Sequence, residues 1–229
     1  MGKNELLRWR KAERERLIAA REALDHATLK RFRQRIDAHV ERAFPGLTSA
    51  TLAFCWPIRN EYDARHLMRK LRERGALTAL PVVVAPKQPL IFREWRPGVK
   101  LASGPLGIPY PVISDCVVPT VVLLPMNGWD EAGYRLGYGG GFFDRTLAGF
   151  SKKPVVIGVS HELARMKTIH PQSWDIPVDW VVTERGIYRR DPEGLVLLDE
   201  PVAGEASTLA SPVCYAGEVA PGYFGERKD

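Results

Sequence analysis

The residues with the clearest chemical potential form one glycine-rich segment, Gly133-Tyr-Arg-Leu-Gly-Tyr-Gly-Gly-Gly-Phe-Phe-Asp-Arg145. Glycine tolerates positive φ angles and lets backbone N–H groups approach an anion closely. The segment is expected to open a helix at about Phe142, and a helix N-terminus attracts phosphate. This pattern favours a phosphate-binding loop, with a plain tight turn as the alternative. The glycines at its centre are Gly137, Gly139, Gly140 and Gly141.

The spacing of these glycines excludes two common nucleotide-binding motifs. It matches neither the G-x-G-x-x-G of dinucleotide-binding folds nor the G-x-x-x-x-G-K-[ST] of P-loop proteins. Asp144 directly follows the glycines, where its carboxylate could cap the helix or hold Mg²⁺ on bound phosphates. The residue pattern leaves both roles of Asp144 open.

A row of arginines near the N-terminus is the second candidate for chemistry. Arg10, Arg14, Leu17, Arg21 and Leu24 lie at offsets 0, 4, 7, 11 and 14. At about 100° per residue, these positions form one narrow stripe on a helix. Arginines interleaved with leucines cannot all be free surface side chains. They either extend to the edge of an apolar face, or they hold an anion or a buried carboxylate.

The third candidate is the segment Trp56-Pro-Ile-Arg-Asn-Glu61, which follows an apolar run expected to be a buried strand. Ligands of α/β proteins bind at the carboxyl ends of strands, so Glu61 there suits ligand recognition. An exposed loop carboxylate is the alternative. His161-Glu162 does not begin a zinc-protease H-E-x-x-H motif, because residue 165 is arginine.

The elements that must position these residues alternate between helix and strand. Residues 4–43 lack Pro and Gly and predict a long basic helical segment, broken near Asp25 and ended by Pro45-Gly46. Continuous apolar runs are typical of strands buried on both faces. The sequence therefore predicts an α/β fold whose sheet is covered on both sides. The expected strands are 51–55, 80–84, 90–95, 117–124, 154–159 and 180–183, with a further helix at 63–74.

Length and composition narrow the class of protein. The chain has 229 residues, of which 45% are hydrophobic and 26% charged, as in ordinary globular proteins. Residues 1–190 predict a single domain, and residues 191–229 predict a poorly ordered tail. The longest apolar stretch, residues 116–126, is far shorter than the roughly 20 residues of a membrane span. A charged N-terminus and three cysteines without C-x-x-C predict a cytoplasmic protein with no membrane partner.

The net charge of +6 indicates an acidic partner. Nucleic acid, a membrane surface or a small anion can each attract a basic protein. The sequence contains no RNP-like aromatic motif, zinc finger or basic zipper, which argues against nucleic acid. We therefore expect small anionic substrates and a monomer, with a nucleic-acid binder as the alternative.

The glycine-rich segment resembles the signature of the 5-formyltetrahydrofolate cyclo-ligase family, which reads roughly G-x-R-L-G-x-G-x-G-[YF]-Y-D-R. Other blocks agree in the same order, and together they cover about residues 6–188. The shared order makes the resemblance specific. These blocks are Arg10, Arg14 and Arg21-x-x-Leu24, then Glu61 with Asp63, Leu80-Pro81-Val82-Val83, and the stretch from Trp174-Asp175 to Glu184.

The resemblance implies a fold and a reaction. The fold would be a three-layer α/β sandwich with a mostly parallel central sheet, preceded by the basic helical segment. The reaction would use ATP to phosphorylate the formyl oxygen of 5-formyltetrahydrofolate. Attack by N10 and loss of phosphate would then give 5,10-methenyltetrahydrofolate. Such phosphoryl transfer needs positioning, hydrogen-bond donors and Mg²⁺ rather than a covalent nucleophile.

The resemblance also implies roles for individual residues. Arg135 and Arg145 are the expected catalytic cations, and Asp144 and Asp175 the expected Mg²⁺ ligands. The expected folate contacts are Trp56, Glu61, Tyr138, Gly139, Gly140, Gly141 and Phe142. The expected ATP contacts are Arg10, Lys11, Arg14, Arg135, Leu136, Gly137, Tyr138, Gly139, Gly140, Gly141, Phe142 and Phe143.

The chain departs from the family pattern at four of these positions. Arg10 stands in place of the usual Lys, and Phe143 in place of a Tyr. Tyr138 and Gly140 replace a basic residue and a Lys that many members carry, so positive charge must come from Arg135, Arg145 or the first helix. These departures leave an alternative function open, a nucleotide-binding paralogue with another substrate or no cyclo-ligase activity.

Overall fold

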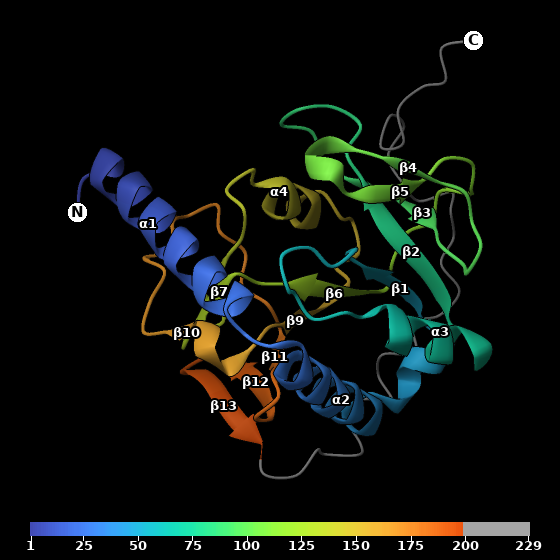
Figure 1. Cartoon of the computed structure of the whole chain (residues 1–229). Helices are drawn as coiled ribbons and strands as arrows, with labels where there is room; N and C mark the ends of the chain where they lie inside the picture. Colours follow the sequence, from blue (N-terminus) through green and yellow to red (C-terminus); the bar gives the residue numbers. More distant parts are fainter. Residues whose placement is uncertain (199–229) are drawn as a thin grey trace.

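A sheet of eight strands runs through the structure in the order β13-β12-β11-β9-β6-β1-β2-β3. The computed structural model describes residues 1–198 (Figure 1). The inner strands are parallel to one another: β1 (Thr51–Phe54), β2 (Leu77–Val82), β6 (Val121–Pro125), β9 (Val155–Val159) and β11 (Trp180–Val182). Antiparallel strands complete the edges: β3 (Ile91–Glu94), β12 (Ile187–Asp191) and β13 (Gly194–Leu198).

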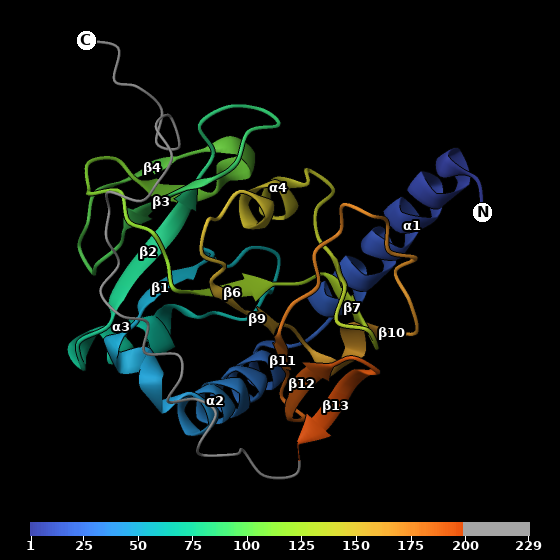
Figure 2. The same ribbon diagram turned by 180° about the vertical axis from the view of Figure 1, so that it is seen from behind.

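Helices cover both faces of this sheet (Figures 1 and 2). Alternate residues of a strand point to opposite faces. Leu52 and Phe54 of β1 pack in one apolar cluster with α2 (His26–Ala43) and α3 (Arg65–Glu73). Ala53, between them, packs in the other cluster with Leu147 of α4 (Phe142–Ala148). The predicted α/β sandwich with a mostly parallel central sheet is confirmed.

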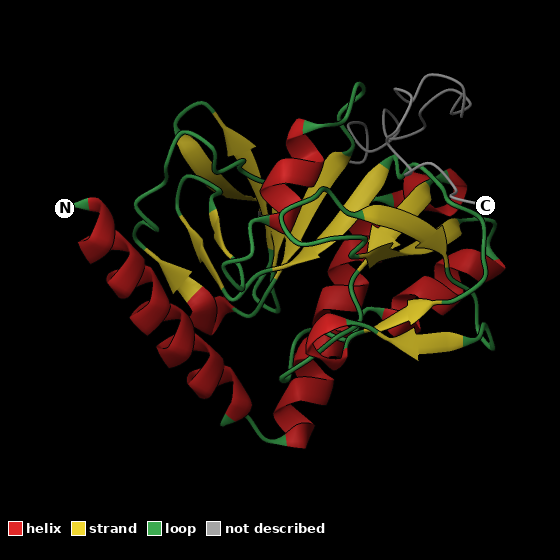
Figure 3. Ribbon diagram, turned by 90° about the horizontal axis from the view of Figure 1, so that it is seen from above, coloured by secondary structure: helices red, strands yellow, loops and turns green. Residues whose placement is uncertain are grey.

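The N-terminal helical segment is a pair of helices, and it breaks near Asp25 as predicted. Helix α1 (Lys3–Glu22) ends before Asp25, which caps α2 by accepting a 2.8 Å hydrogen bond from the Thr28 backbone N–H. Helix α1 lies at the side of the molecule, where Leu17 packs with Leu136 and Ile169 (Figure 3). Its neighbour is a small sheet of β10 (Arg165–Met166), β7 (Gly128–Asp130) and β8 (Arg135–Leu136).

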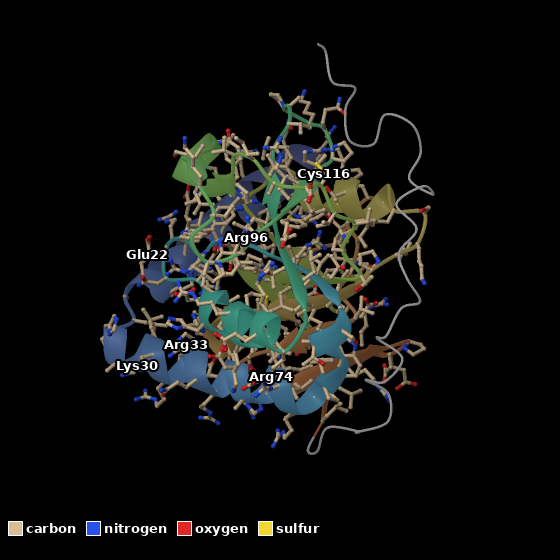
Figure 4. All side chains as sticks on the ribbon, turned by 90° about the vertical axis from the view of Figure 1, so that its right-hand side faces the viewer. Glu22, Lys30, Arg33, Arg74, Arg96 and Cys116 are labelled. Atoms are coloured by element: carbon tan, nitrogen blue, oxygen red, sulfur yellow. The ribbon has the colours of Figure 1, made fainter. Side chains whose placement is uncertain are left out.

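The arginines of α1 differ from the basic residues of α2 and α3. Arg33 on α2 pairs with Asp37 at 2.7 Å, and Arg74 directly after α3 pairs with Glu41 at 3.4 Å. Figure 4 shows Arg33, Arg74 and the exposed Lys30 on the α2–α3 side of the molecule. The Arg74–Glu41 pair lies at the surface, where ion pairs contribute little stability, whereas the Arg33–Asp37 pair is partly buried. In α1, by contrast, Arg21 is buried.

The direction of chain progression reverses between β1 and β6. From β1 the chain continues to β2 on one side, whereas β6, β9 and β11 follow on the other side. In open α/β sheets the carboxyl ends of strands at such a point form a crevice where ligands bind. The loop after β1 and the loop after β6 therefore lie next to each other at the site.

Short elements account for most differences from the predicted strands. The connection predicted over 97–115 contains a hairpin of β4 (Leu101–Ser103) and β5 (Pro109–Pro111), joined by η2 (Pro105–Gly107). The strand predicted at 117–124 begins at Val121, after Pro119. Two further turns of 3-10 helix are η1 (Pro45–Ser49) and η3 (Glu162–Ala164). Within residues 1–198, no helix is both long and apolar enough to cross a membrane.

The predicted start of the tail at residue 191 is wrong, because the sheet continues to Leu198. The Asp191 carboxylate accepts the backbone N–H groups of Glu193 and Gly194 and so forms the turn between β12 and β13. Gly194 has a φ of +139°, and a Cβ there would lie 2.7 Å from the carbonyl oxygen of Glu131. This turn requires a glycine. The rest of the predicted tail, 199–229, lies outside the described residues.

We expect strand β13 to contribute to stability through Leu195, which packs against the second apolar cluster, whereas Val196 is 46% exposed. Replacing Leu195 by Ala should lower the free energy of unfolding by about 1–2 kcal/mol, less than a fully buried leucine. Val196→Ala, the matched control, should cost about 0.5 kcal/mol or less. Urea denaturation of the full chain measures both. Equal effects of the two variants would contradict the packing of β13.

Candidate active site

The candidate site lies at the carboxyl ends of β1 and β6. The loop after β1 contributes Glu61, and the loop after β6 contributes Asn127. The glycine-rich loop, residues 137–141, follows β8 and leads into α4. Helix α1 contributes arginine side chains to the same place. Four segments that are far apart in the sequence therefore meet at the topological reversal of the sheet.

Arg21 is the centre of a buried polar network. Only 5% of the residue is exposed. Its guanidinium donates to the Asn127 side-chain oxygen at 3.0 Å, to the Arg59 carbonyl at 2.7 Å and to the Tyr138 hydroxyl at 3.2 Å. Burying an arginine is costly unless its donors are satisfied and its charge is paired. The nearest carboxylate is that of Glu61, whose Oε1 lies 3.9 Å from Arg21 Nη2.

Glu61 is a buried carboxylate with both oxygens held. Its Oε1 accepts the Tyr138 hydroxyl at 2.8 Å, and its Oε2 accepts the Ile58 backbone N–H at 3.1 Å. Burial raises the pKa of Glu61, although Ile58 N–H and Arg21 oppose this shift. Each carboxylate oxygen keeps a further lone pair. Glu61 can therefore also accept hydrogen bonds from a ligand with a donor-rich edge.

The glycine-rich loop is bordered by two arginines. Arg14 Nε donates to the Gly137 carbonyl at 2.6 Å, and Arg145 donates to the Gly140 carbonyl. Gly139 and Gly141 have φ angles of +91° and +63°, which favour glycine. A Cβ at Gly139 would lie 3.2 Å from the Arg14 guanidinium, and one at Gly141 would lie 2.9 Å from that of Arg145. The absence of side chains lets these cations approach the loop.

The electrostatics at Arg14 favour an anion. Burial lowers the pKa of Arg14, and the positive charge of Arg10 lowers it further. A desolvated guanidinium beside a like charge is stabilised when an anion binds to it. The loop with Arg14 thus has the donors and the charge that a phosphate group needs.

Arg135 is buried and forms an ion pair with Asp144. Its side chain is only 6% exposed, and Nη2 donates to Asp144 Oδ1 at 2.7 Å. Nη1 donates to the Ile176 carbonyl, and the Ile176 N–H donates to the same Asp144 oxygen at 3.2 Å. Arg135 therefore joins the start of α4 to the segment after Asp175, and its charge is balanced by a carboxylate.

Arg10 and Asp175, predicted for ATP and for Mg²⁺, form an ion pair with each other. Arg10 holds both oxygens of Asp175, at 2.6 Å and 3.4 Å, and also donates to the carbonyls of Ile169 and His170. The Gln172 backbone N–H donates to Asp175 as well, at 2.7 Å. These contacts attach the 169–175 loop to α1. They occupy both carboxylate oxygens of Asp175.

The residues fit Mg²⁺ only in part. Within residues 1–198, no group of three or more His, Cys, Asp or Glu side chains could hold a metal ion by itself. Asp175 fits poorly, because the Arg10 guanidinium contacts both of its oxygens and already balances its charge. Asp144 does fit, because its contacts in the described part of the chain involve only Oδ1. Mg²⁺ commonly needs just one or two carboxylates when phosphates supply other ligands.

The other predicted site residues differ in their surroundings. Trp56 is half-buried, and the Arg65 guanidinium carbon lies 4.7 Å from the centroid of its ring. The guanidinium carbon of Arg145 lies 5.4 Å from the centroid of the Phe142 ring. Phe143 packs against the second apolar cluster, and Leu136 packs against Leu17 of α1. Lys11 is exposed and pairs with Glu15 at 3.9 Å. The structure therefore places Phe142 directly after the glycine-rich loop, Trp56 against Arg65 and the first apolar cluster, and Lys11 at the surface.

Arg21, Asn127 and His161 belong to the site region but were not predicted as site residues. Arg21 lies on the predicted arginine stripe. Asn127 and His161 stand two residues after the ends of β6 and β9, so their places after predicted strands were the available signal. His161 is buried with Nε2 3.3 Å from the Asn60 carbonyl. Its Nδ1 lies 3.8 Å from Glu184 Oε2. This histidine supports the turn that carries Glu61.

Comparison with known proteins gives one consistent result. Residues 7–184 match the 5-formyltetrahydrofolate cyclo-ligase family. The chain is 30% identical over 151 residues to the Escherichia coli K12 5-formyltetrahydrofolate cyclo-ligase, covering 63% of this chain and 83% of that one. It is 29% identical over 153 residues to the protein of that name from Mycolicibacterium smegmatis, covering 62% and 77%.

A solved structure has the same fold, and nearly all of that structure matches this chain. The Aquifex aeolicus 5,10-methenyltetrahydrofolate synthetase superimposes with a TM-score of 0.69 at 26% identity. The match covers 82% of this chain and 96% of that one. The likeness therefore includes the sheet and the helices that carry the candidate site.

The conformation of the glycine-rich loop leads to a prediction about stability. Gly141→Ala should lower the free energy of unfolding by roughly 1–2 kcal/mol, because an L-residue is strained at this φ angle and its Cβ would displace Arg145. Gly137→Ala is the matched control, since its Cβ would meet nothing within 4 Å. Thermal denaturation of both variants tests this difference. A Gly141→Ala protein as stable as Gly137→Ala would show that the loop does not need this conformation.

Proposed function

The chain belongs to the 5-formyltetrahydrofolate cyclo-ligase family, and we propose that it converts 5-formyltetrahydrofolate to 5,10-methenyltetrahydrofolate with ATP as co-substrate. The observation that carries this proposal is the contact between the glycine-rich loop, which suits phosphates, and Glu61, which suits a pterin. A glycine-rich loop bordered by Arg14 and Arg145 suits phosphates, and the buried carboxylate of Glu61 lies directly beside it. The alternative of a paralogue without this activity is not favoured by the relatives.

The reaction couples two bond changes. The formyl oxygen attacks the γ-phosphorus of ATP, which releases ADP and leaves a phosphorylated formyl group. The N10 nitrogen then attacks the formyl carbon, and the C–O bond breaks with loss of phosphate and of the N10 proton. Phosphate is a far better leaving group than the oxygen of a formamide. The protein must therefore hold two substrates in line and neutralise the transferred charge.

The nucleotide subsite comprises the glycine-rich loop and the arginines beside it. The backbone N–H groups of residues 137–141 and the guanidinium of Arg14 would bind the phosphates. Arg145 borders the other side of the loop. Arg10 and Arg135 support the subsite by holding Asp175 and Asp144 in place. Lys11 would contact the nucleotide only if its exposed side chain moved from Glu15.

Mg²⁺ would enter this subsite with the nucleotide. Asp144 Oδ2 would be its contact with the protein, and the phosphates would supply the other charged ligands. The ion supplies charge neutralisation on the phosphates when it is bound. Asp144 Oδ1 meanwhile stays on Arg135, which fixes the orientation of the carboxylate.

The folate subsite would comprise Glu61, the Tyr138 ring that contacts it, and two further aromatic residues. The pterin ring presents adjacent N–H donors, and a carboxylate can accept two such donors at once. Trp56, Phe142 and the ring of Tyr138 would form the apolar walls. We further propose that the protein acts as a cytoplasmic monomer on these small molecules and does not bind nucleic acid.

The product provides a direct test of the function. 5,10-Methenyltetrahydrofolate absorbs in the near ultraviolet, where 5-formyltetrahydrofolate does not. We expect this absorbance to appear when the purified full chain meets 5-formyltetrahydrofolate, ATP and Mg²⁺. It should not appear without ATP or when a chelator has removed Mg²⁺ beforehand. Binding of ATP without any product would favour the paralogue alternative.

The position of Arg14 leads to a prediction about nucleotide affinity. A charge-assisted contact with phosphate contributes about 1.5–3 kcal/mol, so Arg14→Ala should weaken ATP binding roughly ten- to a hundredfold. The matched control is Arg8→Ala, since Arg8 is exposed and, within residues 1–198, its side chain bonds only to the Asn4 carbonyl. Calorimetry with a non-hydrolysable ATP analogue measures both. Unchanged affinity in a folded Arg14→Ala protein would remove α1 from the nucleotide subsite.

A further inference from the structure

Tyr138 connects the two subsites that the proposed function requires. It is the one residue other than glycine between positions 137 and 141. Its backbone belongs to the glycine-rich loop, whereas its hydroxyl donates to Glu61 Oε1 at 2.8 Å and accepts from Arg21 at 3.2 Å. The same side chain thus contacts the carboxylate of one subsite from the loop of the other.

The loop has few other attachments within residues 1–198. Arg14 and Arg145 contact it through the carbonyls of Gly137 and Gly140, and glycines add no side-chain contacts. A run of glycines has high conformational freedom, so a loop with few attachments loses entropy when it is ordered. The Tyr138 hydroxyl is therefore a principal restraint on the position of the loop.

The hydroxyl also bridges two buried charges. Arg21 Nη2 and Glu61 Oε1 lie 3.9 Å apart, beyond direct hydrogen bonding, and the hydroxyl bonds to both. Burial and the charge of Glu61 raise the pKa of Tyr138 well above its ordinary value, so it remains a neutral donor. Without the hydroxyl, Oε1 of Glu61 would lose this partner, and the Ile58 N–H would be the remaining hydrogen bond to the carboxylate within residues 1–198.

We propose that the Tyr138 hydroxyl is a positioning group that makes nucleotide binding and folate binding cooperative. The inference rests on the proposed function. Phosphates that order the loop would place Tyr138 against Glu61, and Glu61 held in this way is ready for the pterin. A bound folate would in turn fix Glu61, Tyr138 and the loop for the phosphates. The ligand that binds second then meets a site that the first has already ordered.

Cooperativity of this kind is reciprocal. If the nucleotide increases folate affinity by some factor, folate must increase nucleotide affinity by the same factor. Coupling between sites is commonly about five- to 150-fold. We expect a factor of about five or more in the wild-type chain, and a factor close to one in Tyr138→Phe, which keeps the ring and loses the hydroxyl.

The experiment measures four dissociation constants for each protein by calorimetry. Two belong to 5-formyltetrahydrofolate, without and with saturating Mg²⁺ and the β,γ-imido analogue of ATP, which cannot transfer its phosphoryl group. The other two belong to the ATP analogue, without and with 5-formyltetrahydrofolate. The matched control is Tyr134→Phe. Tyr134 packs beside Leu17 and Leu136, and its hydroxyl has no hydrogen bond within the described residues. Thermal denaturation shows that each variant is folded, and Tyr138→Met replaces Tyr138→Phe if the latter is not.

The results separate this inference from the proposed function. Loss of coupling in Tyr138→Phe, with coupling retained in Tyr134→Phe, supports the role of the hydroxyl. A purely structural role would lower the melting temperature without changing the coupling factor. Equal coupling in wild type and Tyr138→Phe, or none in the wild type, overturns the inference even if the wild type forms product. A wild-type chain that binds neither ligand overturns the proposed function itself.

Discussion

The buried pair of Arg21 and Glu61, bridged by Tyr138, is the interaction on which the site depends. Arg21 comes from α1, Glu61 from the loop after β1 and Tyr138 from the glycine-rich loop, and Asn127 adds the end of β6. Neither charge is stable in the interior without the other and its hydrogen bonds. Helix α1 must therefore dock in one position, because any other position would leave buried charges unpaired.

Two further ion pairs extend this arrangement. Both use carboxylates that the resemblance to the family implies as Mg²⁺ ligands. Arg10 holds Asp175, and Arg135 holds Asp144. Through them α1, α4 and the 169–176 segment become one support for the glycine-rich loop. Arg14 and Arg145 lie beside the loop and donate hydrogen bonds to its carbonyl oxygens, and neither has a carboxylate within ion-pair distance in residues 1–198. The chain thus uses some arginines to shape the phosphate subsite and others to supply its charge.

Local patterns predicted the larger elements well, because apolar runs and helix signals act over short distances. The helix break at Asp25 and the central parallel strands are examples. The two-residue strands β8 and β10 were not predicted, since so short a segment has no periodicity and pairs only after the main sheet forms. The β12–β13 hairpin was missed because residues 191–229 were predicted as one tail, whereas Gly194 forms a turn that closes against Glu131.

The sequence by itself determined the α/β class, the glycine-rich loop, the arginine stripe of α1 and a carboxylate at the end of a strand. Each of these depends on residue type and spacing along one segment. Only the tertiary structure decided which arginine meets which carboxylate, and that Tyr138 lies between Arg21 and Glu61. Partners more than 70 residues apart leave no mark on local spacing. Their pairing follows from the order of strands in the sheet and from the cost of leaving a charge buried alone.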